Sequence, residues 1–186
     1  LPPAPRSFAH LPMHVIYEDD GQLKAATVLA DQETSLQVEA ASGKRSKIKA
    51  AHVLLRFDRP SAAEALATAQ QLAAELDPTF LWEVSGEDDF GFDALAREYY
   101  GASATAEQQT AVALVLHASP LHFYKRGQGH YRKAPPDALR AALASVERTG
   151  RETVEEMRIL LGVLRERGTD EQFAPQPGLA ELEALA

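Results

Sequence analysis

Short runs of alternating apolar and polar residues fill residues 14–57, and residues 52–57 show the two-residue period of a β-strand most clearly. An Asp-Gly pair at 20–21 and a Ser-Gly pair at 42–43 are hairpin signals, because glycine adopts the positive φ that tight hairpins need. The pattern predicts five strands, at residues 14–19, 22–30, 35–40, 44–50 and 52–57.

Five such short strands within about 45 residues bury too little as an open sheet. Closure hides the strand edges and encloses a core built from few residues. We therefore predict a small SH3-like β-barrel over residues 13–58. An OB fold ranks second, because it usually needs a longer chain.

Residues 59–78 change to the apolar spacing of a helix. Ser61 and Glu64 match a capping box, in which each side chain accepts a hydrogen bond from the backbone of the other residue. The Asp-Pro pair at 77–78 ends the pattern, since proline cannot continue a helix. We predict a connecting helix here and place a domain boundary after it.

Two further helices are predicted beyond this boundary. Phe90 and Leu95 fit a hydrophobic staple at the start of the first one. Thr105 and Gln108 form a second capping box, which opens a helix that closes before Pro120. Residues 79–168 are therefore predicted to be mainly helical.

Residues 121–133 read as a β-hairpin that turns at a Gly-Gln-Gly tip. Strand alternation predicts that Leu121 and Phe123 face the core, while Tyr124, Tyr131 and the neighbouring cations are exposed. The order of two helices, a hairpin and a long helix is that of a winged helix-turn-helix, in which the hairpin is the wing.

A long helical region follows at 137–167. Its apolar residues form a near-heptad stripe: Leu139, Leu143, Val146, Val154, Met157, Leu161 and Leu164. Gly150 interrupts the stripe, so one kinked helix and two separate helices are both compatible with it. We expect 1–12 to be a flexible extension and 169–186 to be a linker that leads into a longer protein. The predicted fold class is α+β, a small SH3-like barrel followed by a winged-helix-like domain over 79–168.

Positive charge is concentrated in two segments of an acidic chain. The 186 residues contain 19 Lys and Arg against 27 Asp and Glu, a net charge of −8. Residues 121–133 hold four cations and three aromatics without a carboxylate, and residues 41–56 hold five further cations without one. Such separation favours a polyanionic partner with bases that stack on aromatic rings.

The candidate RNA-binding residues are the cations and exposed aromatics of these two segments: Lys44, Arg45, Lys47, Lys49, Tyr124, Lys125, Arg126, His130, Tyr131, Arg132 and Lys133. The alternative for the lysines of 44–49 is a solvated strand edge, because lysine protects sheet edges from aggregation. The alternative for 121–133 is a hairpin that packs its apolar residues inward while its cations contact only solvent.

Catalytic and metal chemistry find little support in the sequence. The chain has no cysteine, and it lacks the phosphate loop, the His-Glu-x-x-His motif and the Gly-x-Ser-x-Gly motif. The acidic triplets at 18–20 and 87–89 lie where turns and helix starts favour acids anyway. His122 and His130 lack a third zinc ligand. We predict no catalytic residue, metal site or cofactor within these residues.

The sequence also bears on location. No apolar run approaches the roughly 20 residues that a membrane span requires. The absence of cysteine fits a reducing compartment. We therefore expect a cytoplasmic protein without a membrane partner.

Several long segments resemble the start of bacterial ribonuclease II (RNB) family exoribonucleases, most closely the proteobacterial members. They include Phe-Gly-Phe-Asp-Ala-Leu-Ala-Arg-Glu-Tyr-Tyr-Gly and Ser-Pro-Leu-His-Phe-Tyr-Lys-Arg-Gly-Gln-Gly-His-Tyr-Arg-Lys-Ala-Pro-Pro. The resembling segments are residues 17–30, 42–57, 80–84, 90–101 and 119–136.

The resemblance implies a 3′→5′ exoribonuclease that hydrolyses single-stranded RNA with Mg²⁺. In that family the metal-binding aspartates belong to a separate catalytic domain, so these residues would be its non-catalytic N-terminal region. The expected partners are single-stranded RNA and the catalytic domain of the same polypeptide. Two rivals stay open, a winged-helix DNA-binding regulator and a protein-interaction module. The DNA-binding regulator is the weaker rival, because residues 105–118 contain no Lys or Arg that could contact bases in a major groove.

Overall fold

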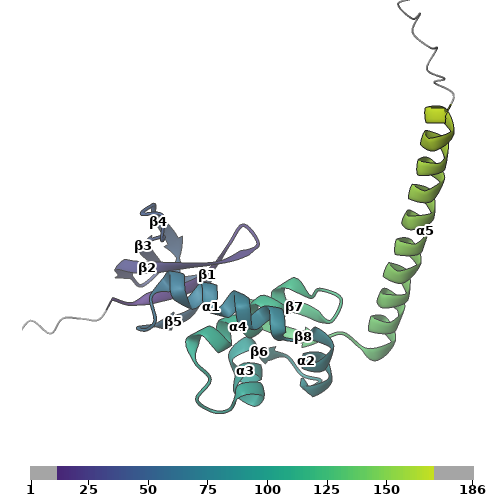
Figure 1. Cartoon of the computed structure of the whole chain (residues 1–186). Helices are drawn as coiled ribbons and strands as arrows, with labels where there is room; N and C mark the ends of the chain where they lie inside the picture. Colours follow the sequence, from purple (N-terminus) through teal and green to yellow (C-terminus); the bar gives the residue numbers. More distant parts are fainter. Residues whose placement is uncertain (1–11, 170–186) are drawn as a thin grey trace, which may run out of the picture. The chain divides into compact units, whose positions relative to one another are not determined.

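The computed structural model describes residues 12–169 and shows a mixed α+β protein with antiparallel sheets and five helices (Figure 1). This confirms the predicted fold class at the level of α+β. The chain divides between Leu139 and Arg140 into two compact units. The predicted N-terminal extension (but for Pro12) and all but the first residue of the C-terminal linker lie outside the described residues.

The first unit begins with a five-stranded antiparallel sheet in the order β4-β3-β2-β1-β5. All five predicted strands are present, and β2 continues two residues further than expected. A short 3₁₀ helix, η1 (Ala50–His52), precedes β5. The strands are β1 (His14–Asp19), β2 (Gln22–Gln32), β3 (Ser35–Glu39), β4 (Arg45–Lys49) and β5 (Val53–Phe57).

Strand β1 is buried on both faces of this sheet. Val15 and Tyr17 point to one face, where they pack in a core that only the strands and η1 supply. Ile16 points to the other face and joins a core shared with the helices. The strand-only core consists of Val15, Tyr17, Ala26, Leu36, Val38 and Ile48, with Val28, Ala50 and Val53 against it.

Four helices follow in the first unit: α1 (Ala62–Glu75), α2 (Pro78–Val84), α3 (Phe92–Tyr100) and α4 (Ala106–Ala118). Both predicted capping boxes are confirmed, at Ser61 and at Thr105. Helix α2 was not predicted. The Asp77-Pro78 pair that ends α1 also starts α2, because Asp77 accepts a hydrogen bond from the Thr79 backbone and proline is favoured at the first helical position.

The predicted hairpin is present as β7 (Phe123–Gly127) and β8 (His130–Lys133). A two-residue strand, β6 (Phe90–Gly91), pairs with β8 and makes a three-stranded sheet in the order β6-β8-β7. Strand β6 is too short to give an alternation signal in the sequence. It fixes the segment before α3 against the hairpin.

A single hydrophobic core joins the sheet to the helices in the first unit. It takes in residues of β1, β2, all four helices, β7 and β8, and helices α1 and α4 lie between the two sheets (Figure 1). The predicted barrel and the first part of the predicted helical domain therefore share their packing.

The last element is α5 (Pro136–Thr169), which runs without interruption through Gly150. Of the two alternatives, one kinked helix or two separate helices, the structure has one helix. The apolar stripe beyond Leu139 is exposed within the second unit, including Leu143, Val146, Met157 and Leu164. Across the described part of the chain, α5 included, no helix combines the length and the apolar character of a membrane span.

Candidate nucleic-acid interface

Residues 121–133, the predicted wing, are called the wing below, and the pairing of β7 with β8 divides their side chains into two sets. Tyr124 lies opposite Arg132, while Phe123 and Lys125 lie opposite Lys133 and Tyr131. Directly opposed residues of an antiparallel pair share a face. Tyr124 and Arg132 therefore belong to one set, and Tyr131 and Lys133 belong to the other.

Tyr131 belongs to the inward set, and the prediction that it is exposed is wrong. Its side chain is 1 % exposed in the shared core. Burial, and to a lesser degree the negative charge of Glu18, raise the pKa of the phenol to about 12. The register shifts between Lys125 and Gly127, so the alternation of β7 does not carry across the turn to β8. A ring buried to this degree cannot stack on a base.

Lys133 is a structural cation of the same inward set. Its side chain is 11 % exposed, and its ammonium donates to the Ser85 carbonyl at 3.0 Å and pairs with Glu87 at 2.9 Å. The ammonium also lies 5.2 Å from the centroid of the Trp82 ring, a cation–π distance. The Trp82 indole in turn donates to the Ala134 carbonyl at 2.8 Å. These contacts hold the end of the wing against α2.

The tip of the wing is docked on the rest of the unit. The Gln128 side chain donates to the Val53 carbonyl, and the Phe92 amide donates to the Gly129 carbonyl at 3.0 Å. Gly129 has a φ of 65°, and a Cβ there would lie 3.0 Å from the Phe92 ring. The tip is therefore closely packed, and the outward face of the strands is the surface that remains for a ligand.

The outward face presents an aromatic ring and two guanidinium groups. Tyr124 is 40 % exposed, and the side chains of Arg126 and Arg132 are partly exposed. Both arginines converge on Asp89, whose Oδ1 lies 2.5 Å from Arg132 Nε and 3.8 Å from Arg126 Nε. His130 is also exposed, with its Nδ1 2.8 Å from the Gln128 carbonyl oxygen. A ring beside two guanidinium groups suits a stacked base and a phosphate.

The cations of the wing have carboxylate neighbours that are distant in sequence. Lys125 pairs with Glu18, Arg126 and Arg132 pair with Asp89, and Lys133 pairs with Glu87. Because the segment itself contains no acid, the sequence suggested an unopposed positive patch. The fold instead brings the two acidic triplets, 18–20 and 87–89, beside the wing. In the sequence, both triplets are only weak candidates for metal binding.

The second basic segment, residues 41–56, runs from the turn before the edge strand β4 to β5, and Lys44 lies in that turn directly before β4. Arg56 on β5 pairs with Asp31. Arg45, Lys47 and Lys49 alternate with the buried Ile48, so they point away from the strand-only core. Arg45 pairs with Glu39 at 2.7 Å. Within residues 12–169, Lys44, Lys47 and Lys49 form no salt bridge. These three lysines, called the lysines of β4 below, are therefore open to phosphate groups at smaller electrostatic cost than the wing cations.

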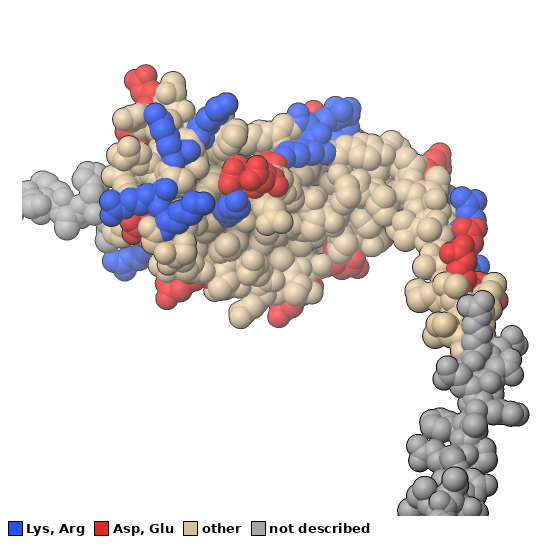
Figure 2. Space-filling view, turned by 90° about the horizontal axis from the view of Figure 1, so that it is seen from above, with Lys and Arg blue, Asp and Glu red and all other residues tan. Residues whose placement is uncertain are grey.

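Positive side chains gather at two places on one face of the first unit. Figure 2 shows Lys and Arg gathered over the five-stranded sheet and over β7 and β8, with carboxylates between them. The turn between β1 and β2 supplies acids at this position, since Glu18, Asp19 and Asp20 line a cavity of about 320 Å³ with Lys125 and His52. A hydrogen bond from Lys24 lowers the pKa of Asp19, which keeps that carboxylate charged. The positive surface is thus interrupted near its middle.

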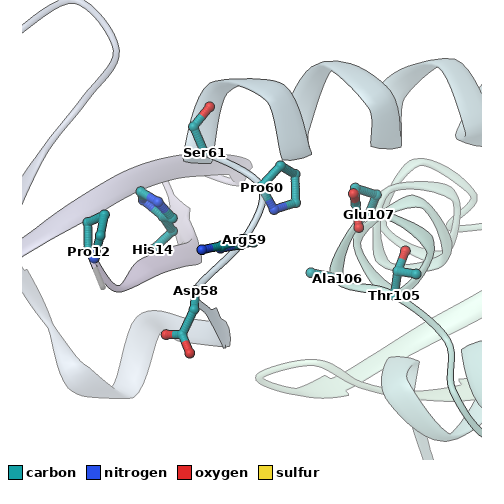
Figure 3. Close-up of a pocket in the computed structure, with 9 residues that line it drawn as sticks. All are labelled: Pro12, His14, Asp58, Arg59, Pro60, Ser61, Thr105, Ala106 and Glu107. Atoms are coloured by element: carbon teal, nitrogen blue, oxygen red, sulfur yellow. The ribbon is translucent and has the colours of Figure 1, made fainter. Parts of the chain in front are cut away.

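A larger hollow of about 820 Å³ lies between the starts of α1 and α4 (Figure 3). The capping hydroxyls that face it are already engaged, Ser61 with the Glu64 amide and Thr105 with the Gln108 amide. Asp58 also lines it and adds negative charge where a helix start would attract an anion. His14, Arg59 and Glu107 also line the pocket, and the two carboxylates, Asp58 and Glu107, disfavour an anion there.

Other predicted groups have clear positions. Phe123 is buried as predicted, whereas Leu121 is 37 % exposed and the prediction that it lies in the core is wrong. His122 is buried, with its Nε2 3.5 Å from the Thr79 hydroxyl. Between residues 12 and 169, no three His, Asp or Glu side chains are arranged to hold a metal ion.

In the predicted winged helix α4 would be the recognition helix, but it is packed into the core. Thr110, Val112, Val115 and Leu116 are buried, and of its thirteen residues, all of them described, only Ala118 is exposed. A helix that reads bases must present one polar face to the major groove. Helix α4 has no such face.

No protein-family model, no curated protein and no solved structure matches the chain. The resemblance to the ribonuclease II family therefore has only the sequence segments behind it.

Proposed function

We propose that these residues form the RNA-binding N-terminal region of a ribonuclease II-type 3′→5′ exoribonuclease. In this proposal the outward face of the wing and the lysines of β4 hold single-stranded RNA and guide it toward a catalytic domain in the same cytoplasmic polypeptide. The chain itself contributes no catalytic residue. The resembling sequence segments support the family, and the geometry of the two basic groups supports RNA as the ligand.

Two finer fold assignments belong to this proposal. Pairing of β1 with both β2 and β5 brings the first and last strands together around a core of their own, which supports an SH3-like barrel. Placement of α3 and α4 between β6 and the β7–β8 hairpin, with β6 paired to β8, supports a winged helix. Because the wing tip and α4 are both packed inward, this winged helix would bind RNA through the outward face of its wing.

The outward face of the wing is the observation that carries the proposal. Tyr124 offers a partly exposed ring for a base, and Arg126 and Arg132 offer guanidinium groups for the adjoining phosphate. Stacking tolerates every base, which suits an enzyme that proceeds along RNA of any sequence. In this proposal the lysines of β4 add phosphate contacts to those of the arginines.

The rival proposals gain less from the structure. A duplex-DNA regulator would need α4 in a major groove, and α4 is buried. A protein-interaction module would fit the exposed stripe on α5, since a long apolar stripe marks a contact surface. We assign that stripe to the catalytic domain of the same polypeptide. The Mg²⁺ of the hydrolysis does not fit residues 12–169, where no acidic group has the arrangement of a metal site.

The test compares ligands and charge-reversed variants by fluorescence anisotropy. Wild-type protein should bind labelled oligoadenylate more tightly than duplex DNA of equal charge, and Arg126→Glu with Arg132→Glu should weaken that binding at least tenfold. Arg151→Glu with Arg158→Glu on α5 is the control, because it reverses two exposed, paired cations outside the interface. A preference for duplex DNA, or equal loss in both double variants, would contradict the proposal. Purified protein should also release no nucleotide from RNA with Mg²⁺.

A further inference from the structure

Two arginines of the wing enclose a single carboxylate. Arg132 Nε lies 2.5 Å and Arg126 Nε lies 3.8 Å from the same oxygen, Oδ1 of Asp89. The arginines come from different strands, Arg126 from β7 and Arg132 from β8. One oxygen between two guanidinium groups has the geometry of a small anion site.

The backbone holds this carboxylate in place. Asp89 directly precedes β6, and β6 pairs with β8 so that Phe90 lies opposite Tyr131. This pairing brings Asp89 beside Arg132, which follows Tyr131. The irregularity of β7 between Lys125 and Gly127 lies at Arg126, the residue whose Nε is 3.8 Å from the Asp89 Oδ1. The arrangement is thus set by two strand pairings, independently of the weak ion pairs themselves.

The neighbouring side chain makes this position suitable for a nucleotide. Tyr124 lies directly opposite Arg132 and is exposed on the same face. Phosphate oxygens bind guanidinium groups with the same donor geometry as carboxylate oxygens. A nucleotide whose base stacks on Tyr124 would bring its phosphate toward the arginines, where Asp89 is found.

Asp89 can be displaced because its ion pairs are partly exposed. The side chains of Arg126, Arg132 and Asp89 are all accessible to water. Exposed ion pairs contribute little net stability and are screened by salt. A phosphate of a polyanion, which also releases counterions on binding, competes well against such a carboxylate.

We propose that Asp89 occupies the position of an RNA phosphate between Arg126 and Arg132, and that bound RNA displaces it. The inference rests on the proposed RNA-binding function and adds a phosphate subsite with a built-in competitor. The competitor lowers the affinity of the free protein for short or weakly charged ligands. RNA that also reaches the β4 lysines overcomes it.

The test replaces Asp89 with the neutral, equally sized asparagine. Asp89→Asn should raise the affinity for labelled oligoadenylate about three- to tenfold and steepen its salt dependence, because two guanidinium groups become available. Asp88→Asn is the matched control, since Asp88 loses the same charge one residue away and forms no salt bridge within residues 12–169. It should change the affinity less than twofold. Equal effects of the two variants, or weaker binding of Asp89→Asn, would overturn the inference.

A second readout separates this inference from the RNA-binding proposal. Inorganic phosphate should shift the Nε–Hε resonances of Arg126 and Arg132 in the NMR spectrum of Asp89→Asn at concentrations that leave the wild-type spectrum unchanged. If these shifts occur while neither protein binds oligoadenylate at low salt, the anion site stands and the RNA-binding proposal fails. If RNA binds and phosphate shifts neither resonance in Asp89→Asn, the subsite assignment fails.

Discussion

Tyr124 and Arg132 lie directly opposite each other on β7 and β8, and they share the outward face of the wing. The inward face holds Tyr131 and Lys133, which serve the core and the junction with α2. One hairpin therefore combines the proposed binding surface with a structural support, and the two faces can be tested separately.

Tyr124→Ala should weaken binding of single-stranded RNA by about 1–3 kcal/mol, because one base loses its stacking partner. Anisotropy with labelled oligoadenylate measures this loss, and the salt dependence should keep its slope since no charge is removed. The control is Tyr99→Ala, which removes a ring of similar exposure, 39 % against 40 %, from α3. Equal losses in the two variants would refute a stacking role for Tyr124.

Replacement of Lys44, Lys47 and Lys49 by glutamine should weaken RNA binding mainly at low salt. Three lost phosphate contacts should reduce the slope of log affinity against log salt by about 2, at roughly 0.7 per contact for a single strand. The charge-matched control replaces Arg148, Arg151 and Arg158 on α5. If the triple variant keeps the wild-type slope, the lysines of the wild type serve only to protect the sheet edge from aggregation.

Lys133→Gln should lower the free energy of unfolding by about 1–3 kcal/mol, because the Trp82 ring loses its cation and the Ser85 carbonyl loses its donor. Urea unfolding followed by the fluorescence of Trp82, the single tryptophan, measures the change. The slope of RNA affinity against salt should stay unchanged. A flatter slope with full stability would show instead that Lys133 contacts RNA.

The buried phenol of Tyr131 predicts a loss of stability at high pH. Its pKa of about 12 in the folded protein lies above the ordinary value of 10, so folding favours the neutral phenol. The resulting stabilisation is complete below pH 10 and is lost as the pH rises toward 12, by about 2–3 kcal/mol. Urea unfolding between pH 9 and 12 should show this decline, and Tyr131→Phe should reduce it. An unchanged decline in Tyr131→Phe would assign the effect to other groups.

Local signals in the sequence predicted the elements whose cause is local. The five strands follow from alternation and Gly turns, and the starts of α1 and α4 follow from the capping boxes at Ser61 and Thr105. Helix α2 was hidden because Asp77-Pro78 both ends one helix and begins another. Strand β6 owes its existence to pairing with β8, which no local pattern records.

The candidate site was predictable in its residue types and unpredictable in its pairing. The aromatic and basic composition of the wing singled out Tyr124, Arg126 and Arg132. The register shift beside Arg126 reversed the expected exposure of Tyr131. Asp89 reaches the arginines only through the β6–β8 pairing, 43 residues away from Arg132 in sequence. Long-range strand pairing, which composition does not encode, decides which charges meet.

The most direct measurement is the affinity for single-stranded oligoadenylate as a function of salt, for the wild type and for Arg126→Gln with Arg132→Gln. The wild type should bind tightly at low salt, and its log affinity should fall linearly with log salt. The double variant should bind more weakly, with a slope flatter by about 1. Identical plots for the two proteins, or no binding by the wild type at low salt, would contradict the claim that the wing holds RNA.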